Sequence, residues 1–339
     1  MKPTLNDMAT ILNLSKSTVS RALSGDPRIA EGTRARVTSL ATQIGYRPNP
    51  MAQALATRRT NTIGLAVPHA PRSFSDPFYL EFLGAVGDAA MRSGYSLFLS
   101  AASADGASGY RSHVEMADAT RVDGMILTEP AVDDERAESL RRAGVPFVFL
   151  GMSSDPEMSW VSGDNVDGAT QAVSHLVQLG HRRIACITGP DEQTATRARF
   201  AGYRAALAAA GLALDRNLIA EGSFTQAGGY AAMKSILAVL TAVSDGAATT
   251  AAEPDPPTAV FACNDVMALG AMRALREAGL AIPSDVSVVG FDGIALGEYV
   301  DPPLATVRQP IAELGQAAVR ILIDAMGAPA AAAAEPVHQ

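Results

Sequence analysis

The chain has 339 residues, two cysteines and a formal net charge of −8. No apolar run reaches the length of a membrane span, and residues 1–25 lack the apolar core of about 7–15 residues that a secretory signal peptide needs. We therefore expect a cytoplasmic protein without a membrane partner. Cys186 and Cys263 lie in apolar runs, and in that compartment they are expected to be small core residues rather than a disulfide.

Residues 4–23 predict two short helices joined by a tight turn. Thr4 followed by Asp7 resembles a capping box, and Ser15 is a suitable N-cap for the second helix. Asn13 suits the turn between them because asparagine tolerates left-handed backbone angles. The apolar residues of the first helix recur at the spacing of one helical face: Leu5, Met8, Ala9 and Leu12.

The second helix separates an apolar face from a polar one. Its inward residues are predicted to be Val19, Ala22 and Leu23, and its outward residues Lys16, Ser17, Ser20 and Arg21. A third helix is expected from about Glu31 to Ile44, where Gly45 stops it. This build is typical of a helix-turn-helix whose second helix reads a DNA groove. The alternative is a small helical domain with a solvated basic face.

The charge distribution favours a nucleic-acid partner for this segment alone. Residues 1–60 hold nine Lys and Arg against three acidic residues, a net charge of +6, whereas the whole chain carries −8. The remaining 279 residues therefore carry −14. A basic module attached to an acidic body indicates that the module binds a polyanion.

A linker follows, with Pro48 and Pro50 breaking the third helix and residues 51–57 forming a helix-prone run. Seven residues are too few for a stable isolated helix, so the run is expected to order only against a partner. One interpretation is a hinge that folds on DNA and inserts Leu55 into the minor groove. The other is a linker helix that packs on the body.

Three stretches resemble the head and hinge of the LacI/GalR family of bacterial transcription regulators. They are Thr4-Leu5-Asn6-Asp7-Met8-Ala9, Ser15-Lys16-Ser17-Thr18-Val19-Ser20-Arg21-Ala22-Leu23-Ser24-Gly25 and Gly45-Tyr46-Arg47-Pro48-Asn49-Pro50. The resemblance extends to about residue 326. It implies a nucleoid-associated repressor homodimer on a pseudo-palindromic operator. It also implies a DNA-contacting set: Thr4, Lys16, Ser17, Thr18, Ser20, Arg21, Asn49, Ala52 and Leu55.

The body is predicted to be α/β. Short apolar runs alternate with helical stretches at 62–67, 96–101, 124–128, 147–150, 184–188, 258–263 and 286–291, which indicates buried strands in parallel sheets. Roughly 280 residues exceed one usual core, so two lobes are expected. The fold class is therefore an all-α helix-turn-helix head with a two-lobed, periplasmic-binding-protein-like body. The resemblance adds chain crossings between lobes near 162, near 292 and near the C-terminus.

These predictions divide the chain into a helix-turn-helix domain, a hinge, a body and a tail. The boundaries are 1–47, 48–60, 61–327 and a disordered tail at 328–339. Within the body, one lobe comprises about 61–162 plus 293–327, and the other about 163–292. Residues 244–257 are expected to be a mobile polar loop.

In parallel α/β lobes a ligand binds beyond the carboxyl ends of the strands. The residues that follow the predicted strands there are polar or aromatic, and the resemblance assigns the effector to Arg199, Asn264 and Asp292, with Phe78, Asp164 and Phe224 as weaker transfers. Each polar residue also has a structural interpretation. Asn264 can cap a helix, Arg199 can pair with a surface acid, and Asp292 can hold a turn with Gly293.

Acceptor groups, one strong cation and nearby aromatic rings suit a neutral polyhydroxylated ligand better than a phosphate. We therefore expect a regulator of sugar or glycoside utilisation genes that releases its operator on binding a small carbohydrate. The alternative within the family is a purine- or nucleoside-dependent repressor. A solute-binding protein without a DNA role is disfavoured because residues 1–25 lack a signal peptide.

The sequence predicts no enzyme, no cofactor and no metal site. Gly-x-Ser-x-Gly and P-loop motifs are absent, and the five histidines show no zinc-ligand spacing. Glu129 and Asp292 are a conceivable carboxylate pair, although nothing in the sequence brings them together. Effector binding is expected to change the angle between the lobes and so the spacing of the two hinges in a dimer, which lowers operator affinity.

Overall fold

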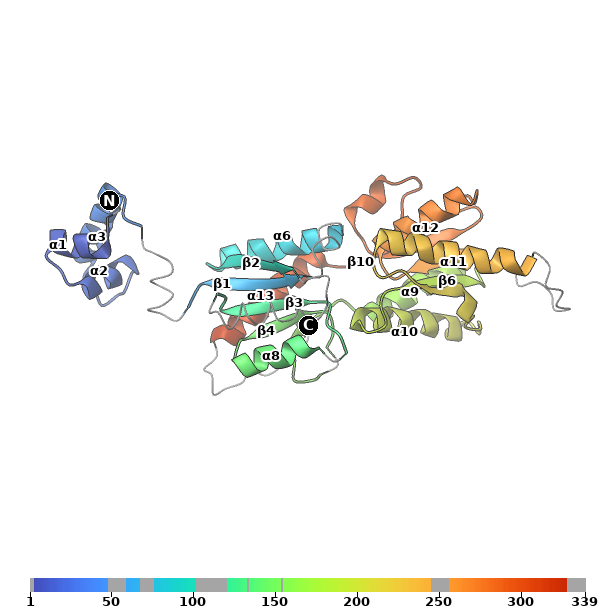
Figure 1. Ribbon diagram of the computed structural model, residues 1–339, viewed down its shortest axis with the longest axis horizontal. Coiled ribbons are helices and arrows are strands. Elements are labelled where there is room, and N and C mark those ends of the chain that lie inside the picture. Colours follow the sequence, from blue (N-terminus) through green and yellow to red (C-terminus); the bar gives the residue numbers. More distant parts are fainter. Residues whose placement is uncertain are drawn as a thin grey trace. The chain divides into compact units, whose positions relative to one another are not determined.

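The computed structural model describes residues 3–47, 59–67, 76–101, 121–132, 134–153, 155–244 and 256–327 (Figure 1). The chain divides into two compact units, Met1–Thr60 and Asn61–Gln339, called here the head and the body. Most of the predicted hinge, including Asn49, Ala52 and Leu55, lies outside the described residues, as do the centre of the 244–257 loop and the 328–339 tail. No helix among the described residues is long and apolar enough to cross a membrane.

The head consists of α1 (Leu5–Leu12), α2 (Lys16–Leu23) and α3 (Glu31–Ile44). The predicted capping box is confirmed, because Asp7 N donates to Thr4 Oγ1 and Thr4 N donates to Asp7 Oδ2. Asn13 and Gly45 end α1 and α3 in the left-handed conformation. The three helices enclose a small core: Met8, Ala9, Val19, Ala22, Val37 and Ala41.

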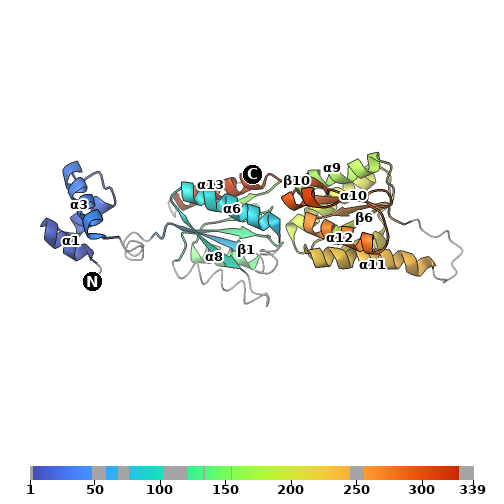
Figure 2. The same ribbon diagram turned by 90° about the horizontal axis from the view of Figure 1, so that it is seen from above.

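The first lobe of the body contains a parallel sheet of order β2-β1-β3-β4-β5. Its strands are β1 (Thr62–Val67), β2 (Ser96–Ala101), β3 (Gly124–Thr128), β4 (Phe147–Leu150) and β5 (Trp160–Val161). Helices α6 (Pro77–Arg92) and α13 (Ile311–Gly327) cover one face, and α8 (Glu135–Ala143) covers the other (Figure 2). Because both faces are covered, β3 is buried throughout and β1 is buried from its second residue onward, as their apolar runs predict.

The second lobe contains a parallel sheet of order β10-β9-β8-β6-β7. Its strands are β6 (Ile184–Thr188), β7 (Ile219–Glu221), β8 (Ala259–Ala262), β9 (Ser287–Asp292) and β10 (Ala305–Arg308). Helices α9 (Asn165–Gln178) and α10 (Thr194–Ala209) lie on one face, and α11 (Gln226–Ser244) and α12 (Asp265–Glu277) on the other (Figure 2). Two 3₁₀ turns, Arg216–Leu218 and Ala295–Tyr299, complete the lobe.

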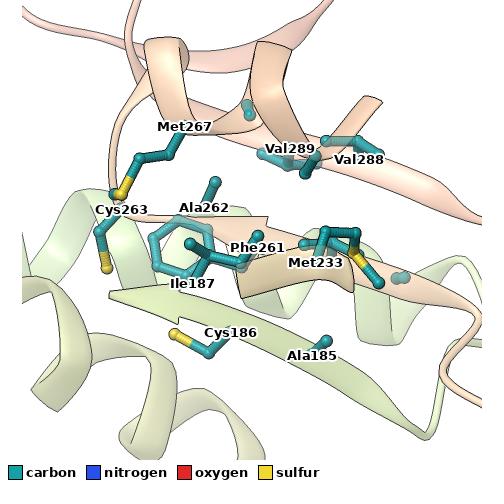
Figure 3. Packing of buried hydrophobic residues seen from close by; sticks show 14 of the residues in the cluster. Ala185, Cys186, Ile187, Met233, Phe261, Ala262, Cys263, Met267, Val288 and Val289 are labelled. Atoms are coloured by element: carbon teal, nitrogen blue, oxygen red, sulfur yellow. The ribbon is translucent and has the colours of Figure 1, made fainter. Parts of the chain in front are cut away.

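Both cysteines belong to the core of the second lobe. Figure 3 shows Cys186 and Cys263 beside Phe261 and Ile187, and both thiols are buried and free. Burial raises the pKa of the Cys186 thiol well above its usual range. The prediction that both are small core residues is confirmed.

The predicted boundary between the lobes at 292/293 is wrong. Residues 293–308 stay in the second lobe, because β10 pairs with β9 in the register Thr306↔Gly290 and Val307↔Phe291. The chain returns to the first lobe only between β10 and α13, near residues 309–310, and not near 292. The sequence missed β10, and also β5 and β7, because an edge strand of two to four residues carries too little apolar pattern to predict.

Candidate DNA-reading helix and effector cleft

Helix α2 presents the polar face that its sequence predicts. Lys16, Ser17, Ser20 and Arg21 are exposed, whereas Val19 and Ala22 are buried. Ser15 caps the helix by accepting from Thr18 N at 3.0 Å. The exposed side chains are therefore fixed to a short helix that a buried stripe holds against the rest of the head. Their number and type suit contacts to phosphates and base edges.

Two of the residues predicted to contact DNA also form hydrogen bonds at the N-terminal caps of their helices. Thr4 is exposed and forms the capping box with Asp7, and its hydrogen bonds hold the pKa of Asp7 below the usual range. Thr18 is half-buried and its Oγ1 lies 2.8 Å from Ser15 Oγ. Both residues lie at the start of a helix, where exposed backbone N–H groups favour an anionic neighbour such as a phosphate.

In the body, one cleft lies where the carboxyl ends of the two sheets face each other. It holds about 620 Å³ of space, which includes open solvent. Five of the six predicted effector residues line it: Phe78, Arg199, Phe224, Asn264 and Asp292. The sixth, Asp164, is exposed and caps α9 by accepting from Asp167 N at 2.9 Å, and it is not among the residues that line the cleft.

Arg199, on α10, is the buried cation of this cleft. Only 6% of its surface is exposed. Its Nε donates to Asn165 Oδ1 at 2.8 Å, its Nη1 donates to the Cys263 carbonyl, and its Nη2 lies 3.3 Å from Asp292 Oδ1. The guanidinium also lies 3.9 Å from the centroid of the Phe291 ring. Because its donors are directed to these partners, Arg199 organises the cleft wall rather than pairing with a surface acid.

Asp292 ends β9 in a strained backbone conformation with φ of 126°. Gln309 Nε2 donates to its Oδ1 at 2.7 Å, so a residue just beyond β10 supports it. Burial raises the pKa of Asp292 to about 8, and the nearby Arg199 charge opposes that shift. Gly293 follows in a left-handed turn, as one of the two interpretations of Asp292 predicts.

Asn264 serves as a helix cap and as part of the cleft wall. Its Oδ1 accepts from Met267 N at 3.0 Å at the start of α12. The neighbouring Asp265 is fully buried and accepts from Gly293 N and Ile294 N, both at 2.8 Å, and from the Thr306 hydroxyl. Asp265 thus ties the turn after β9 to the start of α12.

The aromatic residues form an apolar part of the wall. Phe224 has a left-handed φ of 51° and packs against Gly189, where an added Cβ would lie 2.2 Å from the ring. Phe78, at the start of α6, forms an edge-to-face pair with Tyr79, with 5.3 Å between the ring centroids. An apolar surface next to carboxyl and amide groups suits a ligand with hydroxyls on its rim and a C–H face.

Several cleft residues lie outside the predicted set. Asp76, Tyr79 and Leu150 join it from the first lobe, Asn165 and Gln193 from the second, and Gln309 from beyond β10. Glu129 also lines the cleft, directly after β3, where a residue at a strand end is expected. Asp76 caps α6 by accepting from Phe78 N at 3.0 Å. No pattern in the sequence marked Gln309, because the strand before it was not predicted.

Two known protein families match parts of this chain. Residues 4–49 match the family described as "Bacterial regulatory proteins, lacI family", and residues 173–338 match "Periplasmic binding protein-like domain". The transcriptional regulator CelR of Thermobifida fusca is 37% identical over 330 residues, which cover 95% of this chain and 92% of CelR. The chain belongs to the LacI family. This ligand-responsive regulator is also 34% identical to the transcriptional repressor CytR of Escherichia coli strain K12, over 95% of this chain and 89% of CytR.

Solved structures agree with this assignment. A complex of CelR with cellobiose superposes with a TM-score of 0.73 at 34% identity, covering 99% of this chain and 96% of that one. A lac repressor dimer bound to operator and the anti-inducer ONPF superposes with a TM-score of 0.82 at 29% identity, covering 100% and 97%. The predicted fold class, a helix-turn-helix head with a two-lobed α/β body, is confirmed.

Proposed function

We propose that this LacI-family protein represses carbohydrate-utilisation genes and releases its operator when a small uncharged sugar or glycoside occupies the cleft. The observation that carries the proposal is the composition of the cleft wall. Asp292 and Asn264 offer acceptors and donors beside the Phe224 ring, and Arg199 fixes their arrangement. Sugar hydroxyls pair with such amide and carboxyl groups while a sugar ring packs its C–H face on an aromatic side chain.

The solved relatives support a carbohydrate as the ligand class. One similar structure is a CelR–cellobiose complex, and a family regulator from Enterococcus faecium that is 30% identical holds bound ribose. The cation of the cleft, Arg199, directs its donors to Asn165, Cys263 and Asp292. A phosphate would need donors that are aimed at the ligand, which favours a neutral sugar over a sugar phosphate.

On the DNA side we propose that α2 enters the major groove of one half of a pseudo-palindromic operator. Lys16, Ser17 and Arg21 would face base edges, and Thr4 and Thr18 the phosphates. The lac repressor relative binds its operator as a dimer, and we propose a homodimer here, acting at the nucleoid in the cytoplasm. The hinge residues Asn49, Ala52 and Leu55 remain assigned to DNA from the family resemblance.

The proposed response follows from the two-lobed build. A ligand in the cleft contacts both lobes, so it stabilises one angle between them over others. In a dimer that angle sets the spacing of the two chain segments that lead to the heads. A change in the spacing prevents both heads from binding their half-sites together, and operator affinity falls.

The proposal is tested with the full-length protein and DNA. Operator sequences are first selected from a random pool by repeated binding, and affinity is then measured by fluorescence anisotropy with and without cellobiose, ribose and glucose. A drop in operator affinity of about tenfold or more with one of these sugars supports the proposal. If none of them binds by calorimetry, the carbohydrate assignment is wrong.

A nucleoside corepressor is the second candidate, because the rings of Phe78 and Phe224 both line the cleft and can stack on a base. The same anisotropy assay includes adenosine, cytidine and hypoxanthine. Tighter operator binding with one of these, and no response to sugars, would replace the first proposal by corepression.

We propose that the cleft binds its ligand without catalysing a reaction of that ligand. Glu129 and Asp292, the conceivable carboxylate pair of the sequence, both line the cleft. Asp292 Oδ1, however, accepts from Gln309 and pairs with Arg199, so this oxygen is not available as a catalytic base. Incubation with p-nitrophenyl β-glucoside should release no nitrophenol. Release that Asp292→Asn abolishes would show a hydrolase instead.

A further inference from the structure

Glu129 joins the two lobes at the wall of the cleft. Its Oε1 accepts from the Tyr79 hydroxyl of α6 at 2.5 Å, within the first lobe. Its Oε2 accepts from Gln193 Nε2 at 3.1 Å, from the residue that precedes α10 in the second lobe. One carboxylate therefore receives a donor from each lobe. Gln193 makes no side-chain cap to its own helix, so its amide is directed to the other lobe.

Backbone hydrogen bonds surround this contact and run between the same two segments. Thr194 N donates to the Pro130 carbonyl and Val132 N donates to the Glu192 carbonyl, each at 3.2 Å. Ala131 and Gln193 form an antiparallel bridge. These bonds exist only while the lobes are closed together, since their donors and acceptors belong to different lobes.

The contact lies away from the chain crossings that connect the lobes. The crossings leave β5 and β10, which are edge strands of their sheets, whereas Glu129 follows β3, at the centre of the first sheet. Two strand spacings separate β3 from β5, roughly 10 Å at the usual distance between neighbouring strands. Crossings at an edge act as a hinge, and a contact displaced from the hinge resists opening.

Glu129 is also held in place from outside the cleft. Its φ of 50° is left-handed, which is uncommon for a residue with a side chain. Arg136 Nη2 donates to the carbonyls of Thr128 at 2.9 Å and Glu129 at 3.0 Å. The same guanidinium pairs with Asp134 at 2.6 Å, and both of these side chains are more than nine-tenths buried. This buried pair fixes the backbone that directs the Glu129 carboxylate to the cleft.

We propose that Glu129 is the latch through which a ligand in the cleft controls closure of the lobes, and that the Arg136–Asp134 pair is its positioning element. The proposal rests on the proposed function for the nature of the ligand but not for the latch itself. A ligand hydroxyl at Glu129 shares or replaces the donor from Gln193, because a carboxylate can accept about four hydrogen bonds. The positions of the ligand's hydroxyls therefore determine whether the contact between Glu129 and Gln193 is kept.

The latch is tested by hydrogen exchange of the full-length protein, without any ligand, at the amides of Val132 and Thr194. Glu129→Ala should speed exchange at both amides about tenfold or more, because the charge-assisted contact that keeps the lobes closed is removed. Glu129→Gln keeps an acceptor and should have a smaller effect. The matched control is Glu138→Gln on α8, an exposed acid that pairs with Arg142, and it should leave both amides unchanged.

Arg136 is tested with a conservative pair of variants. Arg136→Met should speed exchange at Val132 and Thr194 as Glu129→Ala does, and Arg136→Lys should restore part of the protection because it keeps a donor for the carbonyls. Exchange in the core strand β8 shows whether Arg136→Met has unfolded the body instead. Unchanged exchange at both amides in Glu129→Ala, or equal loss of protection in β8, overturns the latch.

A second arm separates the latch from the proposed function. Cellobiose and ribose are added to the wild type and to Glu129→Gln, and binding is measured by calorimetry. The affinities of glucose and of its epimer galactose are measured in the same way. If these sugars bind, the latch requires the ratio of their two affinities to differ between the wild type and Glu129→Gln. If no sugar binds while Glu129→Ala still exposes the two amides, the carbohydrate assignment fails, and the contact that Glu129 makes between the lobes stands.

Discussion

The residues predicted to be functional are exposed in the head and buried in the body. In the head, the side chains predicted to contact DNA lie on the exposed face of α2, and the core of six buried residues holds the helix in place. In the body, Arg199, Asn264 and Asp292 are themselves buried and are hydrogen-bonded to the framework. Function and stability are therefore separable in the head and shared in the body.

The reason is the nature of the two ligands. DNA is a large polyanion that meets a protein surface, so exposed donors on a rigid support suffice. A small ligand must be surrounded, and polar groups that surround it are withdrawn from water and need internal partners. The comparison predicts that substitutions in the cleft region cost folding energy, whereas substitutions on the outside of α2 cost only binding.

The largest expected effect is that of Asp265→Ala. This fully buried carboxylate accepts from Gly293 N, Ile294 N and the Thr306 hydroxyl. Its removal takes the acceptor from Ile294 N and leaves Gly293 N and the Thr306 hydroxyl with only longer hydrogen bonds, to Thr306 Oγ1 at 3.3 Å and to the Val307 carbonyl at 3.4 Å. We expect the free energy of unfolding of the body to fall by about 3–5 kcal/mol in urea titrations followed by circular dichroism. The control Asp191→Ala, with a side chain that is 86% exposed, should change it by less than about 0.5 kcal/mol. A loss below about 1 kcal/mol for Asp265→Ala would contradict the comparison.

Val37→Ala tests the small core of the head. Val37 is fully buried there, and we expect the head to lose about 2–3 kcal/mol while the body keeps its stability. Hydrogen exchange in residues 5–44 measures the stability of the head, and exchange in β8 measures the stability of the body. Thr38→Ala, at an exposed neighbouring position, is the control. Equal loss in both units would mean that they are not independent.

Arg21→Ala tests the exposed face. It should weaken binding to a selected operator by about 1–3 kcal/mol, weaken binding to random DNA much less, and leave the stability of the head unchanged because Arg21 is exposed. Fluorescence anisotropy at fixed salt measures both affinities. Arg36→Ala, an exposed arginine of α3, is the matched control. If operator and random DNA lose affinity equally, Arg21 contacts a phosphate rather than a base.

A pH dependence is expected from Asp292. Its pKa is raised to about 8 by burial, whereas an unfolded aspartate titrates near 3.9. The folded state therefore binds the proton more tightly, and stability falls as the pH rises between these two values. Relative to Asp292→Asn, the wild type should lose on the order of 1 kcal/mol per pH unit between pH 5 and pH 8, because only the folded state holds the proton there. A rise in relative stability over that range would show that the ion pair dominates.

Local patterns were sufficient for the head. The capping box at Thr4, the cap at Ser15 and the apolar stripe with Val19 and Ala22 are all short-range features, so sequence spacing predicts them and the structure confirms them. The central strands of both sheets were also predictable, because burial on two faces produces uninterrupted apolar runs. Five of the six effector residues that the family resemblance predicts line one cleft, and their contact with an effector stays a prediction.

Long-range packing decided the rest. Strand β10 is recognisable only by its pairing with β9, so its sequence gave no sign of Gln309 or of the true lobe boundary. Glu129 could be placed at a strand end from the sequence, but its contacts with Tyr79 and Gln193 join segments 50 and 64 residues away. Sequence by itself determined the class of protein and the faces of its helices, since those depend on periodicity and capping. Tertiary structure alone decided which polar side chains share the cleft and which hold the lobes together, because hydrogen bonds between distant segments leave no periodic trace in the chain.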